Sequence, residues 1–340
     1  MKNDNPQYLL LFSNCIPVKG ISRSTIVDIQ RNEIFFIDNH LYEILGECRE
    51  KSWQDILEEY DESSQDVVNS YLNFLQENEL CMWTDTPENF PPLDLSYDTP
   101  SIISNAIIDV KAFSDHPWAQ ILEELASLGC RDIQIRHYDA LEAADLEILL
   151  NKLQGSYIKS IELLFPYQPY YTRKYLQQLT QKNIRIKNII LHNAPFDEIY
   201  SYDPGRGMGN IIFVKKEIDS NQHCGIVNKD YFIIHDPRTF GEFKNFNSCL
   251  NRKVGIDEYG NIKNCPTLPT IYGNIKTDKI KDAITDQFKE VWSVNKDQID
   301  ICKVCEFRYV CSDCRAFTKN DSPLGKPLKC GYDPYQMEWN

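Results

Sequence analysis

The sequence lacks any long hydrophobic run and any excess of positive charge. Its 340 residues include 36 Lys and Arg against 50 Asp and Glu, a formal net charge of −14. This balance disfavours general attraction to nucleic acid or to an anionic membrane surface and suits a basic peptide partner better. The start, MKNDNPQYLLLFSN, has an apolar run of only four residues, too short for a signal peptide, and no stretch is long enough to span a bilayer. We therefore expect a cytoplasmic protein with no nucleic-acid or membrane partner.

Several catalytic signatures are also missing. No serine–histidine–acid set, HExxH or P-loop occurs, so hydrolase and phosphotransferase functions have no support. The glycines of 205–209 could suggest a nucleotide loop, but they precede an apolar stretch at 211–214 that is typical of a strand. A phosphate site needs a helix there, so we interpret this segment as a plain loop.

Cysteine is abundant near the carboxyl terminus. Seven of the twelve cysteines form a CX10GX4C pair around Gly260, a CxxC, a second CxxC five residues later, and a last cysteine fifteen residues on. Thiols at this density in a reducing compartment indicate a bound metal rather than disulfides. The seven are Cys249, Cys265, Cys302, Cys305, Cys311, Cys314 and Cys330. The other five are expected to be buried small hydrophobes: Cys15, Cys48, Cys81, Cys130 and Cys224.

The spacing leaves the identity of the metal open. One closed zinc site needs four ligands and two need eight, so seven thiols fit neither count. Two iron–sulfur clusters could use four cysteines and three, the second with an extra ligand or an open iron. Cys224 is a candidate for the eighth thiol, with His223 as a substitute. Because CxxC pairs serve both metals, iron–sulfur and structural zinc both remain possible.

The first hundred residues predict a small α+β module. Residues 24–30 and 33–37 are β-rich runs separated by two polar residues, which indicates a hairpin. Ser52 with Asp55 three residues later predicts a capped helix, and Ser63-Ser64 predict the start of a longer helix whose apolar face includes Val67 and Val68. The proline-rich, acidic stretch 85–100 is typical of a linker.

Strands then alternate with helices. Apolar strand cores at 133–135, 161–163 and 189–191 recur every 28 residues, which predicts βα units with a parallel sheet, either open or a partial barrel. His192 and His235 follow apolar runs and are expected to be core histidines. After residue 245 the chain is rich in turns, with short strands around a Tyr-Gly-Asn turn and a helix near 278–292. Such a segment has little core, so we expect metal binding to supply much of its folding free energy.

The carboxyl-terminal pattern closely resembles a SPASM domain. The cysteine spacing, together with Gly255-Ile-Asp-Glu-Tyr-Gly-Asn ahead of Cys265-Pro266, carries this resemblance. SPASM domains hold auxiliary iron–sulfur clusters in peptide-modifying radical SAM enzymes. By that resemblance one [4Fe–4S] cluster is ligated by Cys302, Cys305, Cys311 and Cys330. A second is ligated by Cys249, Cys265 and Cys314, its fourth site being open or filled by Cys224.

The middle of the chain is similar to a radical SAM barrel without its radical generator. Residues 118–130 followed by 132–135 look like the first helix and second strand of such a barrel. A radical SAM enzyme needs a CxxxCxxC loop after the first strand, and none occurs anywhere in the chain. Residues 111–117 stand in that place without a cysteine, and Arg136-His137-Tyr138-Asp139 replaces the glycine-rich turn. We therefore expect no S-adenosylmethionine cluster.

The order of the parts resembles the SPASM-domain peptide maturase of grasp-with-SPASM systems, in which an ATP-grasp ligase crosslinks a precursor peptide. The resemblance implies an α/β fold in three domains. Residues 1–95 would be a leader-peptide recognition module, 100–240 a degenerate partial (βα) radical SAM-like barrel, and 245–340 a SPASM iron–sulfur domain. Leader-recognition modules bind an extended peptide at a sheet edge, a mode that leaves little sequence motif.

Three functional hypotheses follow. The first is a maturation protein for a ribosomally synthesised, post-translationally modified peptide, which binds the precursor and carries one or two [4Fe–4S] clusters beside an ATP-grasp ligase. The second is a non-catalytic, zinc-stabilised adaptor. The third is a radical SAM enzyme whose ligands are supplied atypically, for example by Cys130 and His137. The sequence does not decide whether the protein is an enzyme.

Overall fold

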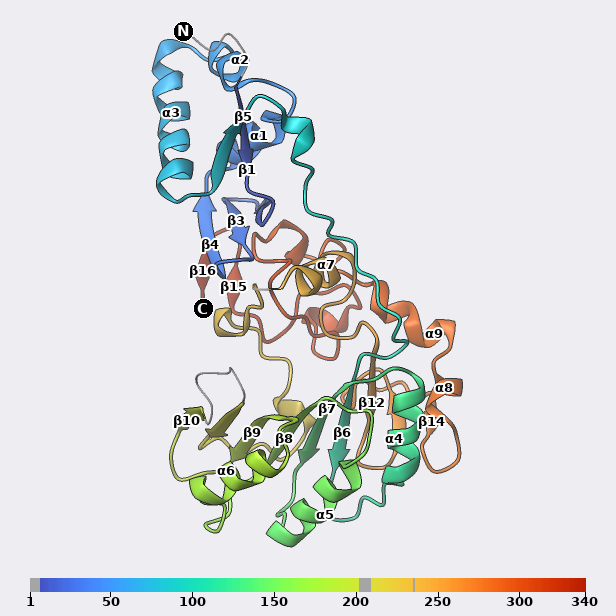
Figure 1. Cartoon of the computed structure of the whole chain (residues 1–340). Helices are drawn as coiled ribbons and strands as arrows, with labels where there is room; N and C mark the ends of the chain where they lie inside the picture. The colour runs from blue at the N-terminus through green and yellow to red at the C-terminus, as the bar shows by residue number, and fades with distance from the viewer. Residues whose placement is uncertain (1–6, 202–208, 235) are drawn as a thin grey trace. The chain divides into compact units, whose positions relative to one another are not determined.

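The computed structural model describes residues 7–201, 209–234 and 236–340. The chain divides into two compact units, each built from separate stretches of sequence (Figure 1). Unit 1 comprises Met1–Tyr97, Val227–Ser248 and Val294–Asn340, and unit 2 comprises Asp98–Ile226 and Cys249–Ser293. Across the described ranges, no helix has the length and hydrophobicity required to cross a bilayer.

Unit 1 begins with two small sheets. Antiparallel strands β2 (Cys15–Val18), β3 (Ser24–Asp28) and β4 (Glu33–Ile37) form a three-stranded sheet, while β1 (Tyr8–Leu11) pairs with β5 (Cys81–Thr84). The predicted hairpin is confirmed as β3–β4. Asn32 in its turn has φ 62°, a left-handed conformation that asparagine tolerates.

Helices α1 (Asn39–Glu47), α2 (Trp53–Glu58) and α3 (Glu62–Glu77) complete this part, and α3 runs beside the β1–β5 pair (Figure 1). The capping box of Ser52 and Asp55 is confirmed. The predicted start of α3 was slightly late, because Asp61 caps the helix by accepting from the Ser64 amide. Val68 is fully buried, but Val67 is 47% exposed, so its assignment to the buried face was wrong. A single 3-10 turn follows, η1 (Pro87–Asn89).

The cysteine-rich part of unit 1 has few regular elements. They are η3 (Lys229–Tyr231), α7 (Pro237–Asn245), η5 (Cys302–Val304), η6 (Lys319–Asp321), β15 (Tyr332–Asp333) and β16 (Glu338–Trp339). An apolar cluster joins this part to the three-stranded sheet and includes Val27, Phe240, Phe307 and Tyr332. The apolar run at 231–234 forms no strand, and His235 lies outside the described residues.

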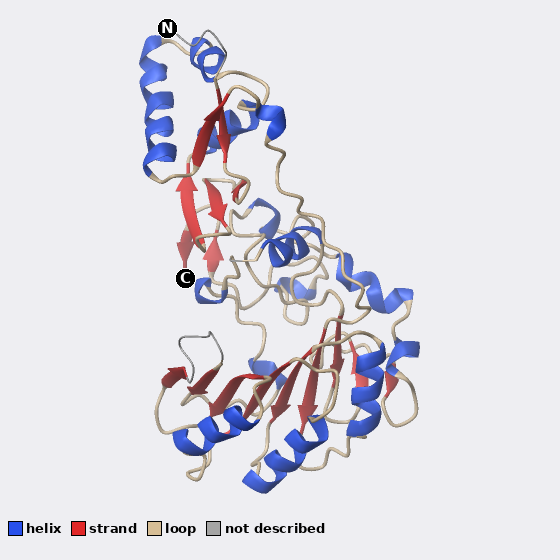
Figure 2. Ribbon diagram, viewed as in Figure 1, coloured by secondary structure: helices blue, strands red, loops and turns tan. Residues whose placement is uncertain are grey.

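Unit 2 contains a nine-stranded mixed sheet with the strand order β10-β11-β9-β8-β7-β6-β12-β13-β14 (Figure 2). The pairings from β11 to β12 are parallel, and the outer strands are antiparallel. The three predicted strand cores are confirmed as β7, β8 and β9. The strands are β6 (Asn105–Val110), β7 (Asp132–His137), β8 (Ser160–Pro166), β9 (Ile186–His192), β10 (Glu198–Ser201), β11 (Asn210–Phe213), β12 (Lys253–Ile256), β13 (Asn261–Lys263) and β14 (Gly273–Asn274).

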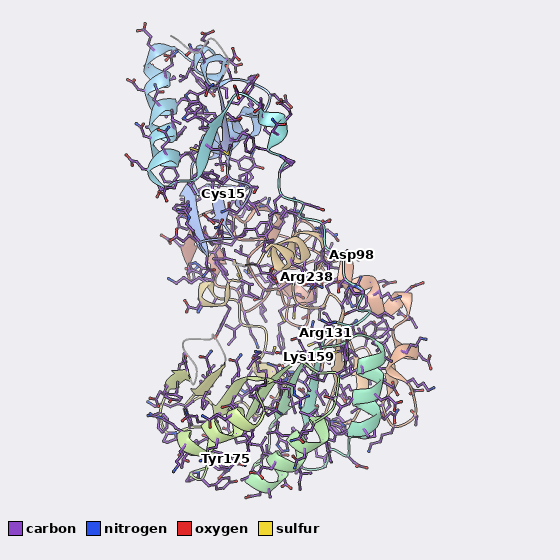
Figure 3. The ribbon with its side chains drawn as sticks, in the orientation of Figure 1. Cys15, Asp98, Arg131, Lys159, Tyr175 and Arg238 are labelled. Carbon is purple, nitrogen blue, oxygen red and sulfur yellow. The ribbon has the colours of Figure 1, made fainter. Side chains whose placement is uncertain are left out.

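Three helices, α4 (Trp118–Ser127), α5 (Ala143–Leu153) and α6 (Arg173–Lys182), connect the parallel strands and cover one face of the sheet (Figure 2). Figure 3 labels Arg131 and Lys159, which directly precede β7 and β8, and Tyr175, which lies on α6 towards the carboxyl ends of the strands. Alternate strand residues such as Ile108 and Ile189 are completely buried in the core. Unit 2 is therefore a mixed α/β fold.

Two other predictions differ from the structure in detail. The helix expected near 278–292 is broken into α8 (Ile280–Ala283), α9 (Asp286–Lys289) and η4 (Glu290–Ser293), because the Thr285 side chain caps a new helix by accepting from the Phe288 amide. Residues 205–208 of the glycine-rich segment lie outside the described residues, and β11 begins at Asn210. One further 3-10 turn, η2 (Asn221–His223), precedes Cys224.

Candidate metal centres

A buried lysine in unit 1 lies beside a group of cysteine thiols. The Lys296 side chain is 2% exposed, and its Nζ donates to the Ser312 carbonyl at 2.9 Å and lies 3.9 Å from Cys311 Sγ. Cys302 and Cys330 also act electrostatically on Lys296, and Cys305 interacts with Cys302 and Cys311. These four thiols are the set predicted for the first cluster.

The local backbone holds these thiols in tight turns. The 3-10 turn η5 carries Cys302, and the Cys305 amide donates to the Cys302 carbonyl at 3.0 Å. Ile301, just before the turn, has φ 66°, which is rare for a β-branched residue and costs conformational energy. Strain of this kind persists where surrounding contacts fix the loop, as at a binding site.

Ionic groups next to the thiols carry more positive than negative charge. Asp313 is buried between two cations, with Oδ1 3.5 Å from Lys296 Nζ and Oδ2 2.6 Å from Arg315 Nε. Asn247 Nδ2 donates to Asp313 Oδ2 at 2.7 Å. One carboxylate therefore faces two buried cations. Since an uncompensated buried charge is costly, this arrangement favours anions nearby, and thiolates bound to a metal would supply them.

The protonation of these groups bears on metal binding. Burial raises the pKa of Cys302 and Cys305, and raises that of Cys311 to about 12. Burial alone would lower the pKa of Lys296, but Cys311 and Asp313 outweigh it and keep that pKa above its ordinary value. These three thiols are therefore protonated near neutral pH in the metal-free protein, and their binding to a metal would release protons.

A second group of thiols lies around Lys253 in unit 2. Lys253 Nζ, on β12, donates to Cys249 Sγ at 3.5 Å, and Cys265 and Cys224 also interact with it electrostatically. These contacts outweigh burial and raise the pKa of Lys253. Burial raises the pKa of Cys265. Cys314, predicted with Cys249 and Cys265, belongs to unit 1 and is buried there.

A glycine lets β12 approach one of these cysteines. A Cβ on Gly255 would lie 2.5 Å from Pro266 Cδ and 2.8 Å from the Cys265 carbonyl carbon. Any larger residue would collide with the backbone there. The glycine that the SPASM-like pattern places ahead of Cys265-Pro266 therefore serves close packing.

The remaining cysteines divide by environment. Cys15, Cys48 and Cys130 are buried, as expected. Cys81 is only partly buried, and Cys224 is exposed, so the expectation that it is a buried hydrophobe was wrong. An exposed thiol close to Cys265 and Lys253 suits ligation better than core packing.

The cysteine thiols are soft donors of the kind that both iron–sulfur clusters and structural zinc sites use. Within residues 7–201, 209–234 and 236–340, no group of three or more His, Cys, Asp or Glu side chains is arranged to hold one metal ion.

The place expected for a radical SAM cluster is filled by a folded loop and an ion pair. The Ala112 amide donates to Asp139 at 2.7 Å, and Ser114 Oγ donates to the Glu258 carbonyl at 2.7 Å. Beside this loop, at the carboxyl ends of β6 and β7, Arg136 and Asp109 form a buried ion pair.

Cys130 and His137 do not form a substitute site. Cys130 precedes β7 and His137 ends it, and a six-residue strand spans roughly 20 Å. The two side chains therefore lie at opposite ends of the strand and cannot ligate one cluster. The hypothesis of atypical ligands at these positions was wrong.

Sequence reasoning missed both lysines. Lys253 follows Cys249 by four residues and Lys296 precedes Cys302 by six, but neither spacing belongs to a motif. A lysine is usually exposed, but Lys296 is buried and Lys253 is partly buried, and each lies beside cysteine thiols.

Comparisons with known proteins give weak likenesses. No protein-family model matches the sequence, and no curated protein matches it. The structure of Streptococcus suis SuiB bound to S-adenosylmethionine is 12% identical, with 94% of this chain and 98% of that chain covered and a TM-score of 0.34. SuiB bound to precursor peptide SuiA is 10% identical, with the same coverage and a TM-score of 0.33. Likenesses of this strength establish neither the fold nor the function of this chain.

Proposed function

We propose that this chain is a maturation protein for a ribosomally synthesised, post-translationally modified peptide. It binds the precursor peptide, carries one or two [4Fe–4S] clusters and acts beside an ATP-grasp ligase. The observation that carries the proposal is that a lysine lies beside thiols of the SPASM-like pattern in each unit, Lys296 near Cys311 and Lys253 near Cys249. The three domains, 1–95, 100–240 and 245–340, take the recognition, platform and SPASM roles that the sequence resemblance implies.

The proposed ligands follow the sequence pattern. One cluster is held by Cys302, Cys305, Cys311 and Cys330, and the other by Cys249, Cys265 and Cys314 together with Cys224. When bound, such clusters pass single electrons or bind a substrate group at an open iron. Around them, the lysines supply positive charge, and the tight turns of the SPASM-like segment orient the thiols.

The proposed peptide site lies in the amino-terminal module. Residues 1–95 contain 18 acidic and six basic residues, so this module carries most of the chain's net negative charge. A cavity of about 220 Å³ runs along β1 and β2 and is lined mostly by apolar residues such as Leu10, Ile16 and Leu93. Strands β1 and β2 each pair on one side only among the described residues. These features suit a basic peptide that adds to a strand edge and inserts an apolar side chain.

The ligation step is assigned to a partner. The sequence contains no ATP-binding loop, and the barrel-like unit holds the Asp109–Arg136 ion pair where a radical SAM enzyme needs its glycine-rich turn. The chain therefore presents the peptide while the ATP-grasp ligase forms the crosslink.

Anaerobic purification with iron, zinc and acid-labile sulfide analysis tests the proposal, together with electron paramagnetic resonance. We expect brown protein with iron and sulfide, and loss of one cluster's iron in the Cys302→Ala, Cys305→Ala double variant. Cys130→Ala is the matched control, since Cys130 is a buried thiol outside both groups. A colourless protein with stoichiometric zinc would overturn the proposal in favour of the zinc-stabilised adaptor.

A further inference from the structure

We infer that Lys296 and Lys253 are positioning residues that raise the reduction potentials of the two clusters, each through the thiolates of its own group. This inference rests on the proposed function, because it requires clusters at these thiols. Neither lysine belongs to the cysteine pattern. Cys311, Cys302 and Cys330 act on Lys296, and Cys249, Cys265 and Cys224 act on Lys253.

The contacts of Lys296 fix its ammonium in place. The side chain is almost fully buried, and Nζ is held by the Ser312 carbonyl at 2.9 Å and by Asp313 Oδ1 at 3.5 Å. In this position it lies 3.9 Å from Cys311 Sγ, within the reach of an N–H···S hydrogen bond. A buried ammonium with fixed partners cannot turn away to solvent, so its charge acts on the thiols at all times.

Lys253 makes the equivalent contact in unit 2. Its Nζ lies 3.5 Å from Cys249 Sγ, and Cys265 and Cys224 are the other groups that act on it most strongly. No carboxylate of the described residues forms an ion pair with Lys253; the nearby Asp257 pairs with Lys263 at 3.1 Å. The positive charge of Lys253 is therefore available to the thiols.

The positive charge near Lys296 is also incompletely neutralised. Asp313 is shared between Lys296 and Arg315, so the three ionic groups together leave one positive charge. Each thiol group thus has about one unbalanced cation beside it. The two thiol groups have this similar local charge although the sequences around their lysines share no motif.

A cation beside a cluster shifts the cluster's reduction potential in a definite direction. Four thiolates outweigh the positive charge of a [4Fe–4S] core, so a ligated cluster is already anionic. Reduction by one electron, taken from an external reductant with no ligand exchanged, makes it more anionic. A nearby ammonium and an N–H···S hydrogen bond stabilise the reduced form more than the oxidised form, and poor solvation strengthens both effects. The lysines therefore raise the potential.

A purely structural role for the lysines makes a different prediction. Suppose that both lysines only filled space and that Lys296 also only bound the Ser312 carbonyl and Asp313. An apolar residue of similar length would then change the free energy of unfolding and leave the reduction potentials unchanged. Lys→Met removes the charge and keeps most of the chain length. Lys→Arg keeps the charge.

The experiment is a redox titration of the full chain with dithionite and mediators, followed by electron paramagnetic resonance. The signals of the two clusters are first assigned with Cys302→Ala and Cys265→Ala. In K296M we expect the reduction potential of the cluster at Cys302 to fall by about 59 mV or more. For one electron this corresponds to a tenfold or larger decrease in the equilibrium constant for reduction. The other cluster should keep its potential. K253M should show the reverse pattern, so each variant is the control for the other, and K253R should stay close to the wild type.

The outcomes separate the inference from the proposed function. Wild-type protein without iron and sulfide overturns both. If wild type, K296M and K253M all contain clusters and the variants keep the wild-type reduction potentials, the inference alone is overturned. An equal shift in the potentials of both clusters in each variant overturns it as well. Loss of iron from both Met variants and from K253R, with an unchanged circular dichroism spectrum, would assign the lysines to cluster assembly and also overturn tuning of the potential.

Discussion

The guanidinium of Arg136 donates two hydrogen bonds to the carboxylate of Asp109, from Nε to Oδ1 at 2.6 Å and from Nη2 to Oδ2 at 2.9 Å. The two residues are register partners on β7 and β6, and their side chains are 5% and 0% exposed. Tyr138 adds a third donor to Oδ2 at 3.2 Å. A charged pair this deeply buried is stable only while both partners are present.

Removing one partner should be worse than removing both. Arg136→Met leaves the Asp109 carboxylate buried without its counter-charge, and we expect the free energy of unfolding to fall by about 3–5 kcal/mol. The double variant Arg136→Met, Asp109→Leu should recover much of that loss, because no charge is then left unpaired. Urea denaturation of the three proteins measures both effects. Additive losses in the double variant would contradict the account of a coupled pair.

Local patterns in the sequence predicted the elements that local interactions build. The β3–β4 hairpin follows from two β-rich runs and a polar turn, and the start of α2 follows from Ser52 and Asp55. The helix expected near 278–292 failed because its apolar periodicity continues across Thr285, whose side chain starts a new helix instead. Apolar periodicity indicates which face of a helix is buried, but it does not indicate where a capping side chain ends one helix and begins another.

Features that depend on distant parts of the chain could not be predicted. Unit 1 joins the amino-terminal module to residues 227–248 and 294–340. No local sequence pattern indicates that these distant segments pack with the amino-terminal module. Lys296 and Lys253 are likewise ordinary lysines in the sequence, and their positions beside thiols appear only after folding. The seven cysteines could be singled out from the sequence because their spacings are typical of metal ligands held by tight turns.

Stability should fall on mild acidification because two histidines are held neutral. Burial lowers the pKa of His137 and His192, and His192 Nδ1 accepts from the Ile218 amide at 3.2 Å. The unfolded chain, with ordinary histidines of pKa about 6.5, then binds more protons than the folded chain. The free energy of unfolding is therefore fully retained above about pH 7 and decreases as the pH falls through 6.5 towards the lower folded pKa values.

Urea denaturation between about pH 7.5 and 5.5 measures this loss, with tryptophan fluorescence as the signal. The comparison is between wild type and the His137→Gln, His192→Gln double variant, which should lose less stability over the same range. Parallel profiles for the two proteins would show that other groups cause the dependence.

A charge placed in the apolar cavity of unit 1 should weaken peptide binding. Ile16 lines that cavity on β2, so Ile16→Arg would place a guanidinium among apolar side chains and repel a basic ligand. The probe is a set of peptides selected from a displayed random library on the full chain, which we expect to be rich in Lys and Arg. Fluorescence titration should show at least tenfold weaker binding to Ile16→Arg, about 1.4 kcal/mol.

The matched control is Ile148→Arg on α5, where Ile148 is 51% exposed in unit 2. Binding to this variant should equal that of the wild type, and added salt should weaken both by screening the acidic module. Equal affinities for Ile16→Arg and Ile148→Arg would remove the cavity from the proposed peptide site.

The last prediction concerns the close approach of β12 to Cys265. In Gly255→Ala the new Cβ would meet Pro266 N at 2.7 Å as well as Pro266 Cδ at 2.5 Å, and backbone atoms cannot move aside without separating the strand from the Cys265 segment. We expect a loss of about 1–3 kcal/mol in the free energy of unfolding and a lower iron content at the second cluster, with the first cluster unaffected. Gly46→Ala is the control, because a Cβ there meets nothing within 4 Å and lies in α1, where alanine is favoured by up to about 1 kcal/mol. If Gly255→Ala kept full iron and sulfide, close packing of β12 against Cys265-Pro266 would have no part in forming the cluster site.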